Sequence, residues 1–406
     1  MTFQTTLDTG FANIDDDFYM SLLIRQQLTY RGLHLAIDGP FRFRIIDRSP
    51  DDEKGLRKQD WDEPSDWARI LPRISYEMRL ETGKIGLLAG ELNNISMGLG
   101  TTLSHFFNAM DVDHYKGGLK AIFDINGNGG TFLINNVIHP EILAGRIQLS
   151  PFSWFKTDHT AHLLEIAYSV TGDIRAPYSF YEEGTKGIVA TGGDLILSFF
   201  QNRLVRARVY ASLMVMDGDI GNHLGLDTQW QLSERRDLYL YLQGEYRYAG
   251  SDYHPAVFNP FYEKNRYDFM STSSDRPLTL ADHLTYEPDM PPGHGFMFEG
   301  DLVWRSILSV EMRYDREGKD RPHWIFFSLG VTPIKGYHLK LFYAADDPTG
   351  GNEIFSYNAL MALAFRARIW GPIDCFGHYS RRFRRDGGGV FYVNDIIAGI
   401  GVSVTY

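Results

Sequence analysis

Charged side chains recur at every second position in several stretches of this chain, and this spacing is its clearest candidate for a functional surface. In residues 33–46, for example, Arg42 and Arg44 share a parity with Asp38, and the intervening residues are mostly apolar. Successive side chains of a β-strand point to opposite faces, so each such strand would carry its charges on one face. The candidate residues for a polar lining are Arg42, Arg44, Arg73, Arg206, Arg208, Arg247, Arg366, Arg368, Glu77, Asp227 and Glu245.

Two interpretations of this lining stay open. Rows of Arg and Lys in a pore select anions or anionic chains. Mixed rows of both signs pair with one another and close the space instead.

Recognised catalytic and cofactor-binding motifs are not found in the sequence. His283 lies near Asp282 and Ser274, and His159 follows Asp158, but neither group has a context such as G-x-S-x-G. The sequence also lacks H-E-x-x-H, a P-loop and a dinucleotide-binding fingerprint. We therefore expect no catalytic residue, no cofactor and no metal site, and the protein is not expected to be an enzyme.

One short segment matches the opening of a calcium loop. Residues 124–129 are Asp-Ile-Asn-Gly-Asn-Gly, but the twelfth position is Asn135 rather than the expected Glu. The segment separates two alternating stretches, where Asn-Gly favours a hairpin. We predict a turn here.

Composition excludes several classes of protein. The chain has 406 residues, a net charge of −11 and a single cysteine, Cys375. The negative charge argues against a nucleic-acid partner, and one cysteine cannot form an internal disulfide. No run of about 18 uncharged apolar residues is present, which excludes a transmembrane helix but not membrane strands, because barrel strands alternate. The N-terminus has no basic and apolar signal segment, so the expectation is either a processed or a non-exported form.

Alternation is the dominant pattern from residue 21 to the C-terminus. We count about 16–18 alternating segments, most of 8–14 residues, whereas ordinary strands average about 5–6. Turn residues separate them, and helical periodicity is nearly absent. The prediction is an all-β, closed antiparallel transmembrane β-barrel with long loops. Residues 1–20 are assigned to an N-terminal tail or an extra strand, and residues 21–406 to one barrel.

Long connections are expected at 47–65, 99–114, 172–186 and 249–294. The last holds six prolines and would either fold over or into one mouth as a plug, or be a disordered surface loop. With an even strand count from residue 21, the long connections of the first two-thirds fall on the side of the termini. Such barrels normally have short periplasmic turns and long outer loops. Either one strand is therefore miscounted, or the long connections do face the periplasm and point to a periplasmic or envelope partner.

The end of the chain carries a family resemblance. Residues 393–406 run from Val393 to an aromatic C-terminus, Tyr406, and their apolar residues share one parity: Ile396, Ala398, Ile400, Val402 and Val404. This ending resembles the closing strand of porin-sized outer-membrane β-barrels of Gram-negative bacteria. The resemblance implies an outer-membrane location, contact with lipid, and recognition of residues 393–406 by the barrel assembly machinery. We expect this strand to close the ring against residues 21–30.

Three functions follow in order of preference. The first is a porin-like channel that passes anions or an anionic polymer such as a polysaccharide through an Arg-lined lumen. The second is a non-conducting anchor or scaffold for an envelope or adhesion complex. The third is an outer-membrane enzyme.

Overall fold

The protein is built almost entirely of β-strands. The computed structural model describes residues 1–14, 17–48, 55–155, 163–178, 184–269, 278–286, 291–318, 323–334, 336–346, 359–386 and 389–406. The strands are β1 (Thr2–Ile14), β2 (Asp17–Tyr30), β3 (Leu33–Ile46), β4 (Arg73–Leu80), β5 (Gly83–Gly90), β6 (Gly118–Ile125), β7 (Asn128–Ile134), β8 (Ile142–Leu149), β9 (Leu164–Pro177), β10 (Thr185–Gln201), β11 (Val205–Met216), β12 (Asp219–Ser233), β13 (Leu238–Ala249), β14 (Gly293–Trp304), β15 (Leu308–Arg316), β16 (His323–Val331), β17 (Tyr337–Asp346), β18 (Ala359–Trp370), β19 (Ile373–Asp386) and β20 (Gly389–Thr405).

The helices are short. They are η1 (Lys58–Asp60), η2 (Asp66–Ile70), η3 (Pro151–Phe155), α1 (Tyr262–Asn265) and α2 (Leu280–Tyr286). Within the described residues, no helix combines the length and apolar character needed to cross a membrane.

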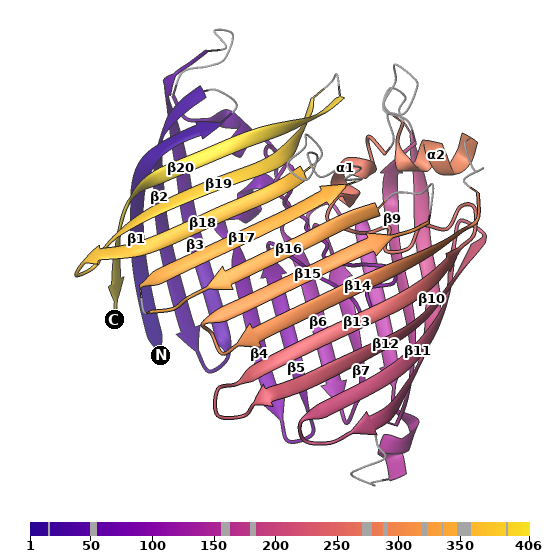
Figure 1. The fold of residues 1–406 in the computed structure, drawn as a ribbon. Coiled ribbons are helices and arrows are strands. Elements are labelled where there is room, and N and C mark those ends of the chain that lie inside the picture. Colours follow the sequence, from indigo (N-terminus) through magenta and orange to yellow (C-terminus); the bar gives the residue numbers. More distant parts are fainter. Residues whose placement is uncertain are drawn as a thin grey trace.

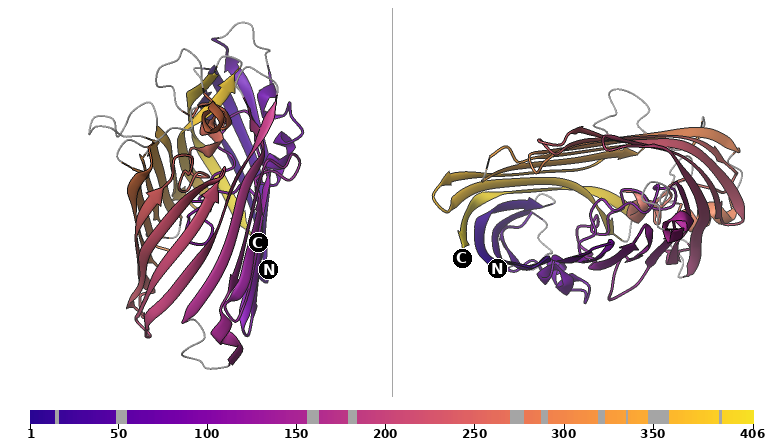
Figure 2. Two further views of the ribbon diagram at one scale, coloured as in Figure 1. Left: turned by 90° about the vertical axis from the view of Figure 1, so that its right-hand side faces the viewer. Right: turned by 90° about the horizontal axis from the view of Figure 1, so that it is seen from below.

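Every strand pairs antiparallel with its neighbours in sequence, and β20 pairs with β1, so the sheet closes into one ring (Figure 1). The predicted class, an all-β closed antiparallel barrel, is confirmed. The predicted count of 16–18 strands is too low, because the ring holds 20 strands. Viewed along its axis the ring is flattened rather than round (Figure 2).

The two strands that the sequence did not reveal are β1 and β14. In β1 the outward parity mixes threonine with Phe3, Leu7 and Phe11, which weakens the apolar signal. In β14 the inward residue Met297 is fully buried, so an apolar side chain stands where alternation expects a polar one. One of the alternating segments counted from the sequence, residues 302–314, covers the end of β14, a turn and most of β15, so two strands were counted as one.

The seam between β1 and β20 differs from the expected one. Residues 21–30 belong to β2, which pairs with β1 and β3, so they do not meet the C-terminal strand. Residues 1–20 contain β1 and the start of β2, which agrees with the alternative of an extra strand and not with that of a tail. At the seam Gly10 lies opposite Gly399, and the backbone N–H of Tyr406 donates to the carbonyl of Phe3 at 2.8 Å.

The expected barrel began at residue 21, whereas the ring begins one strand earlier, with β1. Each strand from β2 onward therefore runs opposite to its expected direction relative to the termini. Both termini lie at one end of the barrel, here called the terminal end (Figure 1). Counting strands from β1 places the connections 47–72, 91–117, 178–184 and 250–292 at the opposite, far end. Of the two explanations considered for the placement of the long connections, the miscounted strand is confirmed, and these connections do not share the side of the termini. Residues 150–163 form the longest connection at the terminal end.

The two faces of the wall carry different side chains. Large apolar residues that remain exposed alternate with buried polar ones along most strands, as with Leu213 and Ser212 in β11. The exposed set includes Phe11, Leu224 and Phe298, with 69%, 62% and 65% of their surface accessible. The alternation places the apolar face outward and the charged face inward.

Two connections from the far end fold into the space inside the ring. The first inward segment is residues 91–117, which join β5 to β6, and the second is residues 250–269. Leu103, Phe106, Phe258 and Tyr262 are fully buried and form one apolar cluster with inward wall residues such as Met214. The first segment was expected only as a loop. The 249–294 connection contributes the second segment, and α2 also packs its Leu280, Ala281 and Leu284 into the cluster.

The seam glycines provide a test of ring closure. A Cβ on Gly399 would lie 2.1 Å from the carbonyl oxygen of Thr9 in β1, so Gly399→Ala should force β1 and β20 apart. We expect a loss of about 1–3 kcal/mol in the free energy of unfolding, measured by denaturant titration of the refolded protein in detergent. Gly244→Ala is the matched control, because the atom nearest to its added Cβ lies at 3.9 Å. Equal stability of the two variants would contradict the described seam.

Candidate functional site

The inward faces of β9 to β15 carry a continuous network of opposite charges. Arg206 approaches Glu165 at 2.8 Å, and Arg208 approaches Asp227 at 2.9 Å and Glu165 at 3.4 Å. Further along the ring, four groups form a chain of ion pairs: Arg247 contacts both Glu245 and Asp315, and Arg313 contacts Asp315 at 2.8 Å. Arg208 and Asp227 stand directly opposite each other on neighbouring strands. The contacts of Glu165 with β11 and of Arg247 with Asp315 each reach across one intervening strand, whereas Glu245 and Arg247, and likewise Arg313 and Asp315, lie two residues apart on one strand.

The predicted lining arginines on β3 and β18 are also paired with carboxylates. Arg366 on β18 reaches Asp8 on β1, and it approaches Asp374 at 3.4 Å. Arg368 lies 3.5 Å from the same Asp374. Arg42 approaches Asp60 of η1 at 3.4 Å, and Arg44 approaches Asp17 at 3.3 Å. Of the two interpretations of the lining, self-pairing of charges therefore describes these residues.

The inner wall of β3 to β6 is different. Arg73 and Glu77 are exposed on β4, and Glu77 has one close cation, Arg79, at 2.9 Å. They border a cavity of about 670 Å³ at the terminal end, whose charged and titratable lining residues are Arg31, His34, Arg73, Glu77, Arg79 and Lys120. Four permanent cations and one carboxylate face this cavity, so its surface carries an excess of positive charge. The structure thus separates Arg73 from the other predicted arginines.

The first inward segment is held by backbone and side-chain hydrogen bonds. Ile95 and Phe106 exchange two backbone bonds of 2.9 Å, which makes a small hairpin inside the barrel. The buried side chain of Asn108 accepts from the N–H of Leu92 at 2.8 Å and donates to the carbonyls of Lys116 and Asn135 at 2.9 and 2.8 Å. One amide thus ties both ends of the segment to the wall.

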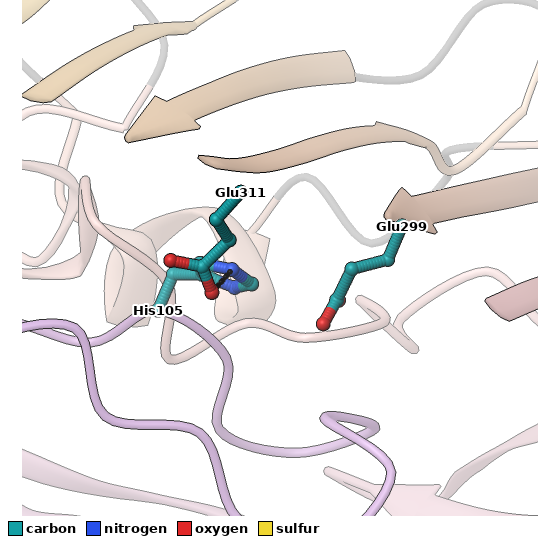
Figure 3. A group of neighbouring side chains, drawn as sticks. All are labelled: His105, Glu299 and Glu311. Atoms are coloured by element: carbon teal, nitrogen blue, oxygen red, sulfur yellow. Dashed lines mark hydrogen bonds and ion pairs between the residues drawn. The ribbon is translucent and has the colours of Figure 1, made fainter. Parts of the chain in front are cut away.

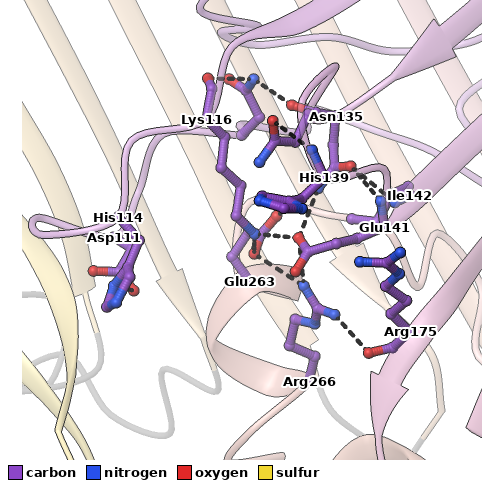
Figure 4. Close-up of polar contacts among 12 residues, drawn as sticks. Asp111, His114, Lys116, Asn135, His139, Glu141, Ile142, Arg175, Glu263 and Arg266 are labelled. Atoms are coloured by element: carbon purple, nitrogen blue, oxygen red, sulfur yellow. Dashed lines mark hydrogen bonds and ion pairs between the residues drawn. The ribbon is translucent and has the colours of Figure 1, made fainter. Parts of the chain in front are cut away.

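A buried ion cluster joins the two inward segments to the wall (Figure 4). Lys116 of the first segment contacts Glu263 of α1 at 2.7 Å and Glu141 at 2.6 Å. Arg266 contacts Glu141 at 2.9 Å and Asp173 of β9 at 3.1 Å. Burial alone would raise the pKa of Glu141, but Lys116 and Arg266 outweigh it and hold that pKa well below 4.5. Burial would lower the pKa of Lys116, but Glu263 and Glu141 raise it above 10.5.

A second group of polar side chains links the first inward segment to β14 and β15. The Nε2 atom of His105 lies 3.0 Å from a carboxylate oxygen of Glu311, and Glu299 lies beside them (Figure 3). One ligand atom from each of the three residues falls within 4.8 Å of the other two. Sequence reasoning missed this group because its members are some 200 residues apart and match no motif.

The sequence features set aside as non-functional occupy structural positions. Asn126 and Gly127 adopt positive φ values of 54° and 76° in the turn between β6 and β7, so the calcium-like segment is a hairpin turn as predicted. His283 is buried on α2, and its ring lies 5.9 Å from that of His254. Ser274, Asp158 and His159 lie outside the described residues.

The outer surface decides the class of barrel. Apolar side chains face outward around a closed ring, and the inner face is charged. The β3–β4 junction is the shortest pairing, from Leu33 to Ala36, and Phe43 beyond it bridges to Leu56. The chain is a β-barrel of the outer-membrane type. Inward apolar residues occur mainly where the wall packs on the two inward segments.

Comparison with known proteins gives only distant likeness. No family model and no curated protein sequence matches the chain. OccAB3 of Acinetobacter baumannii is 10% identical over 100% of this chain and 99% of that chain, with a TM-score of 0.33. OprD of Pseudomonas aeruginosa is 8% identical over 100% and 95%, with a TM-score of 0.33. The outer membrane protein opdK of Pseudomonas aeruginosa is 6% identical over 100% and 99%, with a TM-score of 0.31. Similarity at this level is weak and concerns the barrel architecture alone.

The ion cluster around Glu141 makes the first inward segment sensitive to charge and pH. Glu141→Gln removes one carboxylate from two buried cations and should destabilise the segment by about 3 kcal/mol. Because the pKa of Glu141 is lowered in the folded protein, its contribution is fully present above pH 4.5 and is lost as the pH falls through the lowered value. Hydrogen exchange of peptides from residues 91–117 measures both effects.

The control for this measurement is Glu77→Gln, which removes a carboxylate that faces the terminal-end cavity. Protection of residues 91–117 should be unchanged in this control. Equal protection in Glu141→Gln and the unsubstituted protein would contradict the role given to the cluster, as would protection that declines between pH 5 and 8.

Proposed function

We propose that the protein is an outer-membrane channel for small anionic solutes, narrowed from within by residues 91–117. The observation that carries this proposal is the excess of cations around the terminal-end cavity. Arg73, Arg79 and Lys120 face this space with Glu77 as the acidic lining residue. The other predicted lining arginines are paired with carboxylates, so the attraction for anions is concentrated at this wall.

Small solutes fit the interior better than a polymer does. The first and second inward segments fill part of the lumen with a packed apolar cluster and are fixed by the Lys116 and Arg266 ion pairs. A polysaccharide chain would need a continuous groove along the barrel axis. A solute of a few atoms needs only a polar gap beside the inward segments, and the terminal-end cavity of about 670 Å³ offers it a cationic wall.

The orientation in the membrane follows from the position of the termini. We place the terminal end in the periplasm, with residues 393–406 available to the assembly machinery during insertion, and the long connections outside the cell. A periplasmic partner would then meet short turns and residues 150–163. The outer surface contacts outer-membrane lipid.

A second candidate function is a non-conducting anchor in the outer membrane. The observation that favours it is the packing of both inward segments, which could close the lumen completely. Deleting the first segment separates the two functions, since Gly90 and Gly118 are direct neighbours on β5 and β6 and a short linker can join them.

Replacement of residues 91–117 by a short Gly-Ser linker should raise single-channel conductance several-fold, because the segment that narrows the lumen is gone. Planar-bilayer recording of the purified protein measures this change. Heat-modifiable migration on a gel shows that the variant is folded. A folded variant that conducts no ions would contradict the channel and favour the anchor.

Charge selectivity tests the proposed permeant. In a KCl gradient the reversal potential should indicate a preference for chloride, and the double variant Arg73→Gln/Lys120→Gln should shift it toward potassium. Arg236→Gln, which removes an exposed cation in the turn between β12 and β13, is the control and should have little effect. A preference for potassium in the unsubstituted protein would overturn the assignment to anions.

A further inference from the structure

The inner wall of β13 to β15 holds more carboxylates than its cations neutralise. Five inward carboxylates share two guanidinium groups in this region: Glu245, Glu299, Asp301, Glu311 and Asp315 with Arg247 and Arg313. Asp301 and Glu311 stand directly opposite each other on β14 and β15. Like charges in this cross-strand position repel, so the arrangement calls for a compensating positive charge.

One of these carboxylates has a buried oxygen atom whose hydrogen-bonding capacity is unsatisfied within the described residues. The Oδ1 atom of Asp301 is inaccessible to solvent and has no hydrogen-bond partner among the described residues. Arg313 lies 2.7 Å from Glu299 but also forms an ion pair with Asp315. It therefore compensates the negative charge of Glu299 only in part. Buried polar atoms are normally satisfied, so an unsatisfied carboxylate oxygen beside other carboxylates points to a cation.

The first inward segment brings an imidazole to this same place. His105 is fully buried and adopts a positive φ of 52°, which is uncommon for a residue other than glycine or asparagine. Its Nε2 atom faces Glu311 at 3.0 Å, and its Nδ1 atom lies 2.9 Å from the hydroxyl of Ser104. The ring of Phe326 packs against it with centroids 4.2 Å apart. These contacts fix the orientation of the imidazole ring, as hydrogen bonds do for metal-ligating histidines.

We propose that His105, Glu299 and Glu311 bind a divalent first-row transition-metal ion that fastens the first inward segment to the wall. Their ligand atoms already lie within 4.8 Å of one another, which suits metal-ligand distances of about 2.0–2.2 Å after a small closure. A donor set of one imidazole and two carboxylates favours zinc or a similar ion over calcium, which prefers oxygen alone. Asp301 lies next to the site as a further carboxylate.

Proton balance at the site is straightforward. Without metal, the Nε2–H of His105 donates to Glu311. On binding, the Nε2 proton is released to solvent and Nδ1 takes up one proton in exchange, so the imidazole stays neutral and its Nε2 lone pair binds the ion. The Ser104 hydroxyl, which donates to Nδ1 without metal, then accepts from Nδ1–H, since a hydroxyl can donate or accept. Glu299 and Asp301 line a cavity of about 390 Å³, which provides a route for the hydrated ion and space for a bound water.

The test is equilibrium binding of Zn²⁺ to the purified, refolded barrel after chelation, with metal content measured by mass spectrometry. We expect one ion per chain in the unsubstituted protein. The dissociation constant for Zn²⁺ should rise by about tenfold or more in Glu299→Gln and in Glu311→Gln. Co²⁺ should give a visible absorption band that both variants lose. Glu317→Gln is the matched control, because Glu317 also forms a buried pair with a histidine, His254, at 3.0 Å but lies outside the three-residue group.

A second measurement follows the segment itself. Zn²⁺ should slow hydrogen exchange in peptides from residues 91–117 of the unsubstituted protein and leave the exchange of Glu311→Gln unchanged. Absence of binding overturns the proposal, and so does binding that both glutamine variants retain. Neither measurement depends on conductance, so the metal site and the channel can fail separately.

Discussion

Closure of the backbone hydrogen-bond ladder is the constraint on which the rest of the structure depends. A wall that faces hydrocarbon has no water to pair its N–H and C=O groups, so each strand must have a partner on both sides. The pairing of β1 with β20 completes that requirement. It depends on glycines at positions 10 and 399, which allow the two strands to approach closely at the seam. The position of β1 also fixes which end of the barrel carries the long connections.

Inside the ring, charge and packing divide the lumen into regions with different properties. Arg208 on β11 is matched by Asp227 on β12, and Arg313 on β15 by Asp315 of the same strand, so these buried charges are compensated locally. Around Lys116 and Arg266 the ion pairs fasten the inward segments. Along β4 to β6 the cations of the terminal-end cavity outnumber its single lining carboxylate. The number of arginines therefore says less about permeation than their pairing does.

The sequence predicted the barrel because most strands alternate between a lipid face and a polar face. The prediction failed where this alternation is interrupted. In β14 the fully buried Met297 points inward, so an apolar residue interrupts the polar parity of that strand. Pairing was also unreadable, since partners such as Arg366 and Asp8 meet only after the ring closes. The same holds for His105, whose metal-binding partners lie on β14 and β15.

Alternate residues of each strand face lipid and a watery lumen, and thiol labelling tests this assignment most directly. In a Cys375→Ala background, Ser75→Cys and Tyr76→Cys place a thiol on the inward and outward faces of β4 at adjacent positions. In protein reconstituted into lipid vesicles, a membrane-impermeant maleimide should modify Ser75→Cys and leave Tyr76→Cys unmodified. Equal labelling of both positions, or labelling of Tyr76→Cys alone, would contradict the barrel and its lumen as described.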